Sequence, residues 1–344
     1  DLTILTKLRF VMDELESLRV PPKPVTMNGT GVVLNYIKRI HAARQTGNLV
    51  LDQMGLRSIP LEVFMLTGLT KLRLSDNEIG VIPPEIASLE NLRHLVLDRN
   101  KIRDIPDELG SLDQLELLSL VENEIEFLPL SLCQCENLQS IQIAQNKLES
   151  PPPEIVQEGT QAILQYMRTL REGEMYKRLD LREMNFAFFP REVCVLTELS
   201  DLCLANNNIR TVSPDIRLLS GLTRLQLQEN LLNQLPREMG ALTELLSIDV
   251  SQNEISSLPF EVGAWVLLTR FKAGNNSLRE LPSSIGNWVK VVEMEVQDNS
   301  LRSLPRTICQ MVSLIRLTAS DNEFTFLPEE LFDCPALEVL ILDG

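Results

Sequence analysis

Leucine, isoleucine and asparagine recur along the chain at fixed intervals. Residues 69–79, 92–102 and 115–125 share the pattern LxxLxLxxNxL, which advances by 23 residues. A proline follows each of these segments, with apolar residues three and six places after it. The pattern recurs in twelve complete units and one incomplete unit, which begin at positions 46, 69, 92, 115, 138, 176, 199, 222, 245, 268, 291, 314 and 337.

Each unit predicts one short strand followed by a turn. Apolar residues at positions 4 and 6, such as Leu72 and Leu74, lie on one face of a strand because side chains alternate. One unit cannot bury that face, so we expect the units to stack with parallel strands and a shared core. The asparagine at position 9 suits a turn, where its carboxamide can bond to the neighbouring turns. The ten asparagines are Asn77, Asn100, Asn123, Asn146, Asn207, Asn230, Asn253, Asn276, Asn299 and Asn322.

Two insertions interrupt the repeats in the same way. Residues 33–40 and 163–170 match after a shift of 130 residues, with apolar side chains at i, i+3, i+4 and i+7. That spacing predicts amphipathic helices over 30–43 and 160–171. Thr30 and Thr160 are the expected N-caps, because a threonine hydroxyl can accept from a free backbone N–H of the first turn.

These features divide the chain into blocks. Residues 2–20 repeat the unit pattern and are expected to end a preceding block. The predicted organisation is the end of a preceding block at 1–28, a linker helix at 29–47, a first block of five repeats at 48–158, a linker helix at 159–175, and a second block of seven repeats plus a truncated one at 176–344.

The repeat resembles the leucine-rich-repeat family, specifically its intracellular 23-residue class. The block ends, with Pro151-Pro152-Pro153-Glu154 before the second helix, resemble those of cytoplasmic Ras-group and Roco-type proteins. The resemblance implies an α/β solenoid, a curved horseshoe with a parallel β-sheet on its concave face, segmented by the two amphipathic helices. It also implies partner binding in signalling, with small GTPases among the possible partners.

Charge and composition exclude several other classes. The chain has 48 acidic and 32 basic residues, a net charge of −16 that disfavours nucleic-acid binding. The chain has no stretch of about 18 consecutive apolar residues, so the sequence predicts no membrane-spanning helix. The six cysteines stand far apart and lack the clusters of disulfide-capped extracellular arrays, which favours a reduced, cytoplasmic setting.

The sequence assembles no catalytic, cofactor-binding or metal site. The chain has two histidines, His41 and His94. The sequence places neither of them in a Ser-His-Asp or Cys-His arrangement typical of nucleophilic catalysis. Cys135 occupies a position that leucine fills in other units, so we expect it to be buried rather than metal-bound. Trp265 and Trp288 also stand at core positions. We therefore predict a protein that is not an enzyme.

Partner binding is expected on strand residues that point away from the core. In the first block, basic side chains surround a small apolar spot, a combination typical of interface hot spots. In the second block, arginine recurs at position 3 of every second unit, and its planar fork is a common interface anchor. The candidate partner-binding residues are Lys71, Arg73, His94, Val96, Arg99, Leu117, Val121, Arg178, Arg224, Arg270 and Arg316.

The favoured function is a non-enzymatic scaffold that binds proteins on the concave face during intracellular signalling. Two alternatives stay open at this point: the regulatory array of a larger Roco-type GTPase or kinase, and a structural subunit of a large assembly. An extracellular recognition array fits the cysteine spacing less well.

Overall fold

Short parallel strands, one in each repeat, form two separate sheets. The computed structural model describes residues 21–27 and 29–343, so the predicted block end at 2–20 lies outside the described residues. The chain divides into two compact units, Asp1–Arg168 and Thr169–Gly344. We call the sheet of the first unit array 1 and that of the second array 2.

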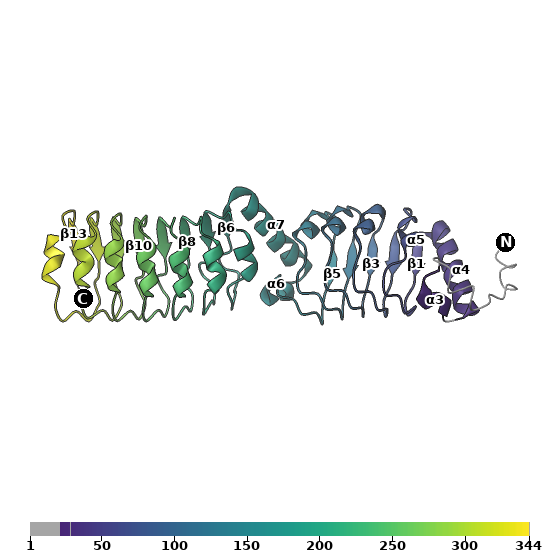
Figure 1. Cartoon of the computed structure of the whole chain (residues 1–344), viewed down its shortest axis with the longest axis horizontal. Coiled ribbons are helices and arrows are strands. Elements are labelled where there is room, and N and C mark those ends of the chain that lie inside the picture. The colour runs from purple at the N-terminus through teal and green to yellow at the C-terminus, as the bar shows by residue number, and fades with distance from the viewer. Residues whose placement is uncertain (1–20, 28, 344) are drawn as a thin grey trace. The chain divides into compact units, whose positions relative to one another are not determined.

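Both arrays follow the order of the sequence (Figure 1). In array 1 the strands are β1 (Asn48–Val50), β2 (Lys71–Arg73), β3 (His94–Val96), β4 (Leu117–Ser119) and β5 (Ser140–Gln142). In array 2 they are β6 (Arg178–Asp180), β7 (Asp201–Cys203), β8 (Arg224–Gln226), β9 (Ser247–Asp249), β10 (Arg270–Lys272), β11 (Glu293–Glu295), β12 (Arg316–Thr318) and β13 (Val339–Ile341).

The strand register confirms the predicted repeat. Leu72 pairs with Leu49 on one side and with Leu95 on the other, each 23 residues away. In β2 the middle residue, Leu72, is fully buried, whereas Lys71 and Arg73 are exposed. This alternation gives each sheet a core side and an exposed side. We call the exposed side, with positions 3 and 5 of each unit, the strand face.

The position-9 asparagines form the predicted ladder. Asn100 donates from Nδ2 to the carbonyls of Leu74 and Leu97 at 3.0 and 2.9 Å, and its Oδ1 accepts from the N–H of Ile79 at 3.0 Å. The same bonds recur in array 2, for example around Asn230. Each carboxamide therefore ties one turn to the turn of the preceding repeat, where buried backbone groups would otherwise lack partners.

A proline precedes most of the short 3-10 helices that lie across the core from the strands. Proline suits this place because it ends the extended half of the unit and has no N–H to satisfy. These helices also stack closely: a Cβ on Gly263 would lie 2.9 Å from the carbonyl oxygen of Ser284. Their bounds are Pro84–Ser88, Asp107–Ser111, Leu130–Gln134, Arg191–Val195, Pro214–Leu218, Arg237–Ala241, Phe260–Ala264, Ser283–Asn287, Arg306–Gln310 and Glu329–Asp333.

The residue just after most of the 3-10 helices is buried in the core, as predicted for Cys135, Trp265 and Trp288. Leu89, Cys135, Trp265 and Trp288 all occupy this position and are fully buried. The indole N–H groups of the two tryptophans donate to the carbonyls of Met239 and Val262 at 2.9 and 2.8 Å. The tryptophan rings stack with their centroids 5.9 Å apart. Burial thus explains both tryptophans and Cys135, whose pKa it raises to about 11.

Both predicted helices are present and are longer than expected. They are α4 (Thr30–Thr46) and α7 (Thr160–Tyr176). Within its unit, α7 buries Ile163 and Leu164, and α4 buries Val33 and Tyr36. In the described part of the chain, the other α-helices are α3 (Lys23–Met27), α5 (Leu61–Phe64) and α6 (Pro153–Glu158).

The N-cap prediction for the threonines was wrong. Gly29, with φ +88°, is the N-cap of α4 and makes no side-chain cap bond, so Thr30 is already inside the helix. Thr160 begins α7, and its hydroxyl accepts instead from the N–H of Ile141 in β5 at 2.9 Å. A glycine with positive φ precedes each threonine and leads into the helix, and at Thr160 the hydroxyl is free to bind the neighbouring strand.

Candidate functional site: the strand faces

Array 1 brings the candidate residues of the first block together. In neighbouring strands Lys71 lies beside His94, which lies beside Leu117, and Arg73 lies beside Val96. Arg99 and Val121 follow the strands in the turns. The lysine and arginines are exposed, and the apolar residues are half-buried. We call these seven residues the array 1 patch: Lys71, Arg73, His94, Val96, Arg99, Leu117 and Val121.

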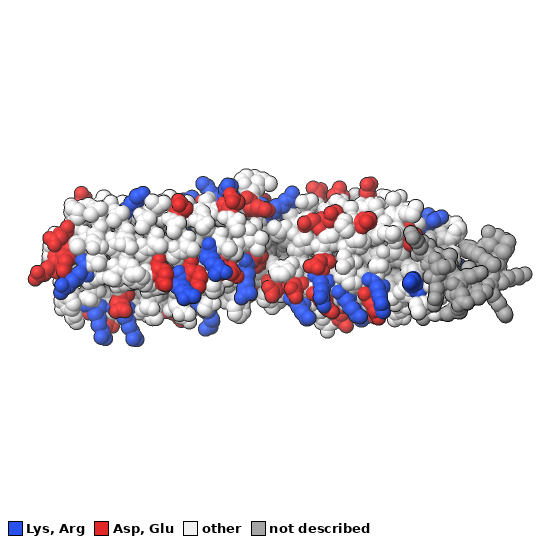
Figure 2. Space-filling view, in the orientation of Figure 1, with Lys and Arg blue, Asp and Glu red and all other residues white. Residues whose placement is uncertain are grey.

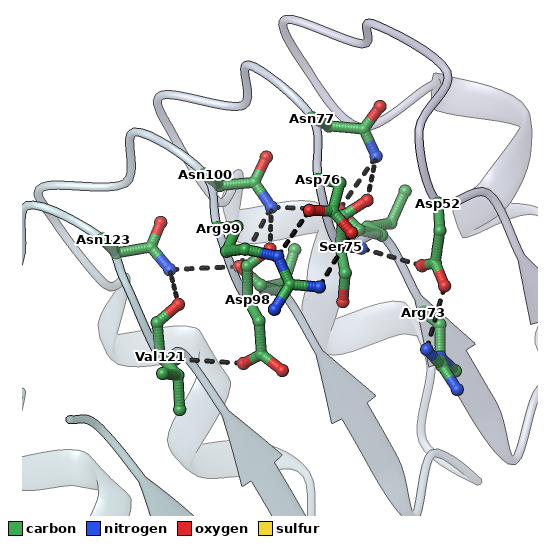
Figure 3. Close-up of polar contacts among 12 residues, drawn as sticks. Asp52, Arg73, Ser75, Asp76, Asn77, Asp98, Arg99, Asn100, Val121 and Asn123 are labelled. Atoms are coloured by element: carbon green, nitrogen blue, oxygen red, sulfur yellow. Dashed lines mark hydrogen bonds and ion pairs between the residues drawn. The ribbon is translucent and has the colours of Figure 1, made fainter. Parts of the chain in front are cut away.

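Carboxylates from neighbouring repeats pair with the two arginines of the array 1 patch (Figure 3). Arg73 Nη2 lies 3.0 Å from Asp52 Oδ2, and Arg99 binds Asp76 with two nitrogens. The hydrogen bond from Arg99 lowers the pKa of Asp76 below its usual value. The array 1 patch is therefore much less positive than its arginines alone suggest.

His94 also faces a carboxylate. Its Nε2 lies 3.6 Å from Glu116 Oε2, while the other oxygen of Glu116 accepts from Arg93 at 2.8 Å. These acidic partners were not among the residues predicted from the sequence. The signal was present in the row of position-8 residues, where Asp76 stands 23 residues before Arg99.

Two aspartates behind the array 1 patch hold the backbone as well (Figure 3). Asp52 Oδ1 accepts from the N–H of Ser75 at 2.9 Å, and Asp98 Oδ1 accepts from the N–H of Val121 at 3.0 Å. Asp98 also accepts from the Ser119 hydroxyl at 2.6 Å. These bonds orient the turns that carry the exposed side chains, so the array 1 patch has a rigid support.

The strand face of array 2 is hollowed. A hollow of about 570 Å³ lies over β6–β10 and is lined by five cations and three aspartates together with neutral side chains. A second hollow of about 570 Å³ lies on the other side of the position-3 row. The charged lining residues of the first hollow are Arg178, Arg182, Arg224, Arg270, Lys272, Asp180, Asp201 and Asp249.

The predicted arginines form one row in array 2, at every second strand. Arg178 and Arg224 both pair with Asp201, which lies in the strand between them. Arg270 Nε is 3.7 Å from Glu293 Oε2. Among the residues that the structure describes, Arg316 makes no ion pair. The row therefore holds four arginines and two carboxylates.

Position 5 of array 2 is acidic instead, because it holds Asp180, Asp249 and Glu295 but one cation, Lys272. Lys272 Nζ lies 2.9 Å from Glu295 Oε1, and this hydrogen bond raises the pKa of Lys272. Asp249 accepts from both the N–H and the hydroxyl of Ser251, at 3.0 and 2.6 Å. In Figure 2, basic and acidic side chains lie side by side over both arrays on the face shown.

The described residues contain no arrangement typical of metal binding. They hold no group of three or more histidine, cysteine or acidic side chains that could bind a metal ion. The six cysteines are free thiols, and all except Cys309 are buried. In the described part of the chain, no helix is long and apolar enough to cross a bilayer.

Comparison with family models agrees with the repeat geometry. Residues 67–111 match a model described as Leucine Rich repeats (2 copies), and residues 90–148 match one described as Leucine rich repeat. Residues 67–148 contain leucine-rich repeats. Neither matching model describes a catalytic domain. No curated protein sequence is a significant match.

Solved leucine-rich-repeat structures resemble the chain at low scores. A Leptospira interrogans protein is 26% identical, with 85% of this chain and 83% of that chain covered and a TM-score of 0.40. The ectodomain of an Arabidopsis thaliana receptor kinase, solved in complex with CASPARIAN STRIP INTEGRITY FACTOR 2, is also 26% identical, with 83% and 40% covered and a TM-score of 0.44. A Listeria monocytogenes internalin is 19% identical, with 99% and 86% covered and a TM-score of 0.38. The chain thus spans less than half of the plant ectodomain.

Proposed function

We propose that this leucine-rich-repeat chain is a non-enzymatic scaffold that binds a partner protein on the concave, strand-bearing face of its repeats. The observation that carries the proposal is the charged hollow of about 570 Å³ over β6–β10. Its arginines contribute nothing to the core, since their side chains are 58–70% exposed at Arg178, Arg224 and Arg270. A concave surface with converging polar groups is the usual form of a binding site.

The array 1 patch is the second contact surface in this proposal. Val96, Leu117 and Val121 supply apolar contact area, and Arg73 and Arg99 border it. Interfaces commonly gain their binding energy from such an apolar centre with charged residues at its rim. Because each arginine already has a carboxylate partner, we expect the apolar contacts to contribute most of the affinity here.

We place this binding in cytoplasmic signalling, with small GTPases among the candidate partners. The support is the resemblance of the block ends around 151–154 to Ras-group and Roco-type repeats. The unbridged cysteines are compatible with a reducing compartment. We assign the two contact surfaces to the blocks 48–158 and 176–344, which the linker helices at 29–47 and 159–175 delimit.

Site-specific cross-linking tests the face that binds. A photoreactive amino acid replaces Lys71 on the strand face in one variant and Glu85 in the 3-10 helix of the same repeat in the other. In cell extract we expect the Lys71 variant to capture one predominant protein and the Glu85 variant to capture none in excess of background. Capture of many proteins from both positions would instead indicate a structural subunit of a large assembly.

Charge reversal tests the array 1 patch. We expect Arg73→Glu with Arg99→Glu to abolish capture of the partner, because each new glutamate would face a carboxylate and repel an acidic partner. The matched control is Arg57→Glu with Arg103→Glu, since both arginines are exposed and paired with glutamates outside the strand face. Thermal unfolding should be alike in the two double variants. Unchanged capture by the first variant would contradict the assignment of the array 1 patch.

A further inference from the structure

The position-3 arginines of array 2 stand in a regular row. Arg224, Ser247 and Arg270 are register partners in three adjacent strands. The same row continues through Glu293 to Arg316, and in the other direction through Asp201 to Arg178. Neighbouring strands lie about 4.8 Å apart, so consecutive arginines of the row are separated by about 9.6 Å at the backbone.

This row has a surplus of positive charge in an acidic chain. Four arginines face two carboxylates, because Asp201 is shared by Arg178 and Arg224 and Glu293 is 3.7 Å from Arg270. The excess remains when the neighbouring aspartates are counted, because five cations and three aspartates line the first hollow. The net charge of the whole chain is −16, so a local excess of two positive charges marks this row as a place for an acidic partner segment.

Hollows flank Arg178, Arg224 and Arg270 of this row on both sides and leave their guanidinium groups accessible. The first hollow borders Gln226 and Asp249 at position 5. The second borders position 2, where Leu246 and Val292 are 42% and 40% exposed. A chain lying along the row would therefore meet arginines beneath it and apolar side chains along one edge.

The spacing of the arginines selects one backbone conformation. A polyproline II helix has three residues per turn and rises about 3.1 Å per residue, so every third side chain points the same way at intervals of about 9.3 Å. A β-strand repeats its side-chain direction every two residues, at about 6.7 Å, which does not match the row. The polyproline II spacing agrees with the arginine spacing of about 9.6 Å within the reach of a guanidinium group.

We propose that Arg178, Arg224, Arg270 and Arg316 bind an acidic segment of a partner protein in polyproline II conformation, with a carboxylate at every third residue. The segment crosses the strands of array 2, and each carboxylate accepts charge-assisted hydrogen bonds from one arginine. This inference rests on the proposed function, which it deepens by naming the chemistry of the partner.

Peptide binding to the purified chain tests the spacing. The probe is fluorescein-labelled (Pro-Pro-Glu) repeated four times, and its control has the same composition with the four glutamates contiguous. We expect the regular peptide to bind about tenfold more tightly in fluorescence anisotropy, with affinity falling as salt is raised. Equal affinity of the two peptides, or no binding of either, would overturn the proposal.

Variants then locate the site. Arg224→Gln with Arg270→Gln should weaken binding of the regular peptide by about tenfold or more. Asp201→Asn should strengthen it by about threefold, because two arginines lose their shared competitor. The matched control is Arg210→Gln with Arg217→Gln, which changes the net charge equally at exposed arginines outside the strand face. If both double variants weakened peptide binding equally, the proposal would be overturned, because the change in the net charge of the chain would then explain the loss of affinity.

Two further results separate this proposal from the scaffold function. If a labelled oligothymidylate bound more tightly than the regular peptide, the row would be a phosphate site and the proposal would be wrong. If both peptides failed while strand-face cross-linking still captured one protein, the scaffold function would stand and only the acidic segment would be refuted.

Discussion

In array 1, Arg73 and Arg99 each have a carboxylate of their own, whereas in array 2 Arg178 and Arg224 share Asp201. The two arrays have the same strand register and the same asparagine ladder. Their strand faces nevertheless differ, because pairing depends on which residues the neighbouring repeats place within reach. In array 1 one carboxylate balances each of these arginines, whereas in array 2 one carboxylate balances two of them.

The cores differ in a related way. At the position after the 3-10 helix, array 1 has leucines and Cys135, and array 2 includes Trp265 and Trp288. Both sets are buried, so one backbone plan accommodates side chains of quite different volume. The asparagine ladder is therefore common to both arrays, whereas the volume of the core side chains and the charge of the strand face differ between them.

We expect the largest loss of stability from removing an asparagine of the ladder, which both arrays share. Asn100→Ala removes two hydrogen bonds to the carbonyls of Leu74 and Leu97 and one from the N–H of Ile79, all buried. We expect a loss of about 3 kcal/mol or more in the free energy of unfolding, because unsatisfied buried polar groups are costly. Urea denaturation followed by circular dichroism measures it.

A parallel substitution in array 2 sharpens this test. Asn230→Ala should cost about as much as Asn100→Ala, because its bonds are equivalent. Asn208→Ala, at an exposed position next to the ladder, is the control and should change little. A clear difference between Asn100→Ala and Asn230→Ala would show that the ladder does not act equally in the two arrays.

The next effect concerns what the arrays do not share. Trp288→Leu gives array 2 the residue that array 1 has at Leu89. We expect a loss of about 2–3 kcal/mol, from the cavity and from the lost bond to the Val262 carbonyl. Equilibrium unfolding in urea, followed by the fluorescence of Trp265, measures it. The control is Val289→Ala at the exposed neighbouring position, which should change the unfolding free energy little. An unchanged unfolding midpoint for Trp288→Leu would show that array 2 repacks around leucine.

The smallest effect concerns the turn before each asparagine. The position-8 residue of every complete repeat has a left-handed backbone, with φ +60° at Gln145 in array 1 and φ +53° at Gln252 in array 2. Glycine adopts this conformation without the penalty of a Cβ. We expect Gln145→Gly and Gln252→Gly each to stabilise its array by about 0.5 kcal/mol in urea denaturation. The control Gln226→Gly, in strand β8, should destabilise instead. If Gln252→Gly destabilised array 2, the contacts of the glutamine side chain would contribute more free energy than its left-handed backbone costs.

Most of the fold could be predicted from the sequence. Strand positions, the ladder of asparagines, the place of the prolines and the burial of both tryptophans all followed from one repeated pattern. Helix starts at Thr30 and Thr160 were also predicted, but their capping role was wrong. A threonine before a helical pattern has the same signature whether its hydroxyl serves the helix or a neighbouring strand, and only the position of β5 relates Thr160 to Ile141.

The sequence by itself determined which residues of this protein form rows. Stacking at a period of 23 residues places every twenty-third side chain beside its equivalent, and burial of the leucines then sets the direction of the others. The tertiary structure alone decided which charges meet. The 23-residue spacing places Asp76 beside Arg99 and Asp201 between Arg178 and Arg224. Whether neighbours form an ion pair depends on distances of a few ångströms between side-chain tips, which the spacing alone does not fix. That is why these neighbours could be found in the sequence, while their pairing and the sharing of Asp201 could not.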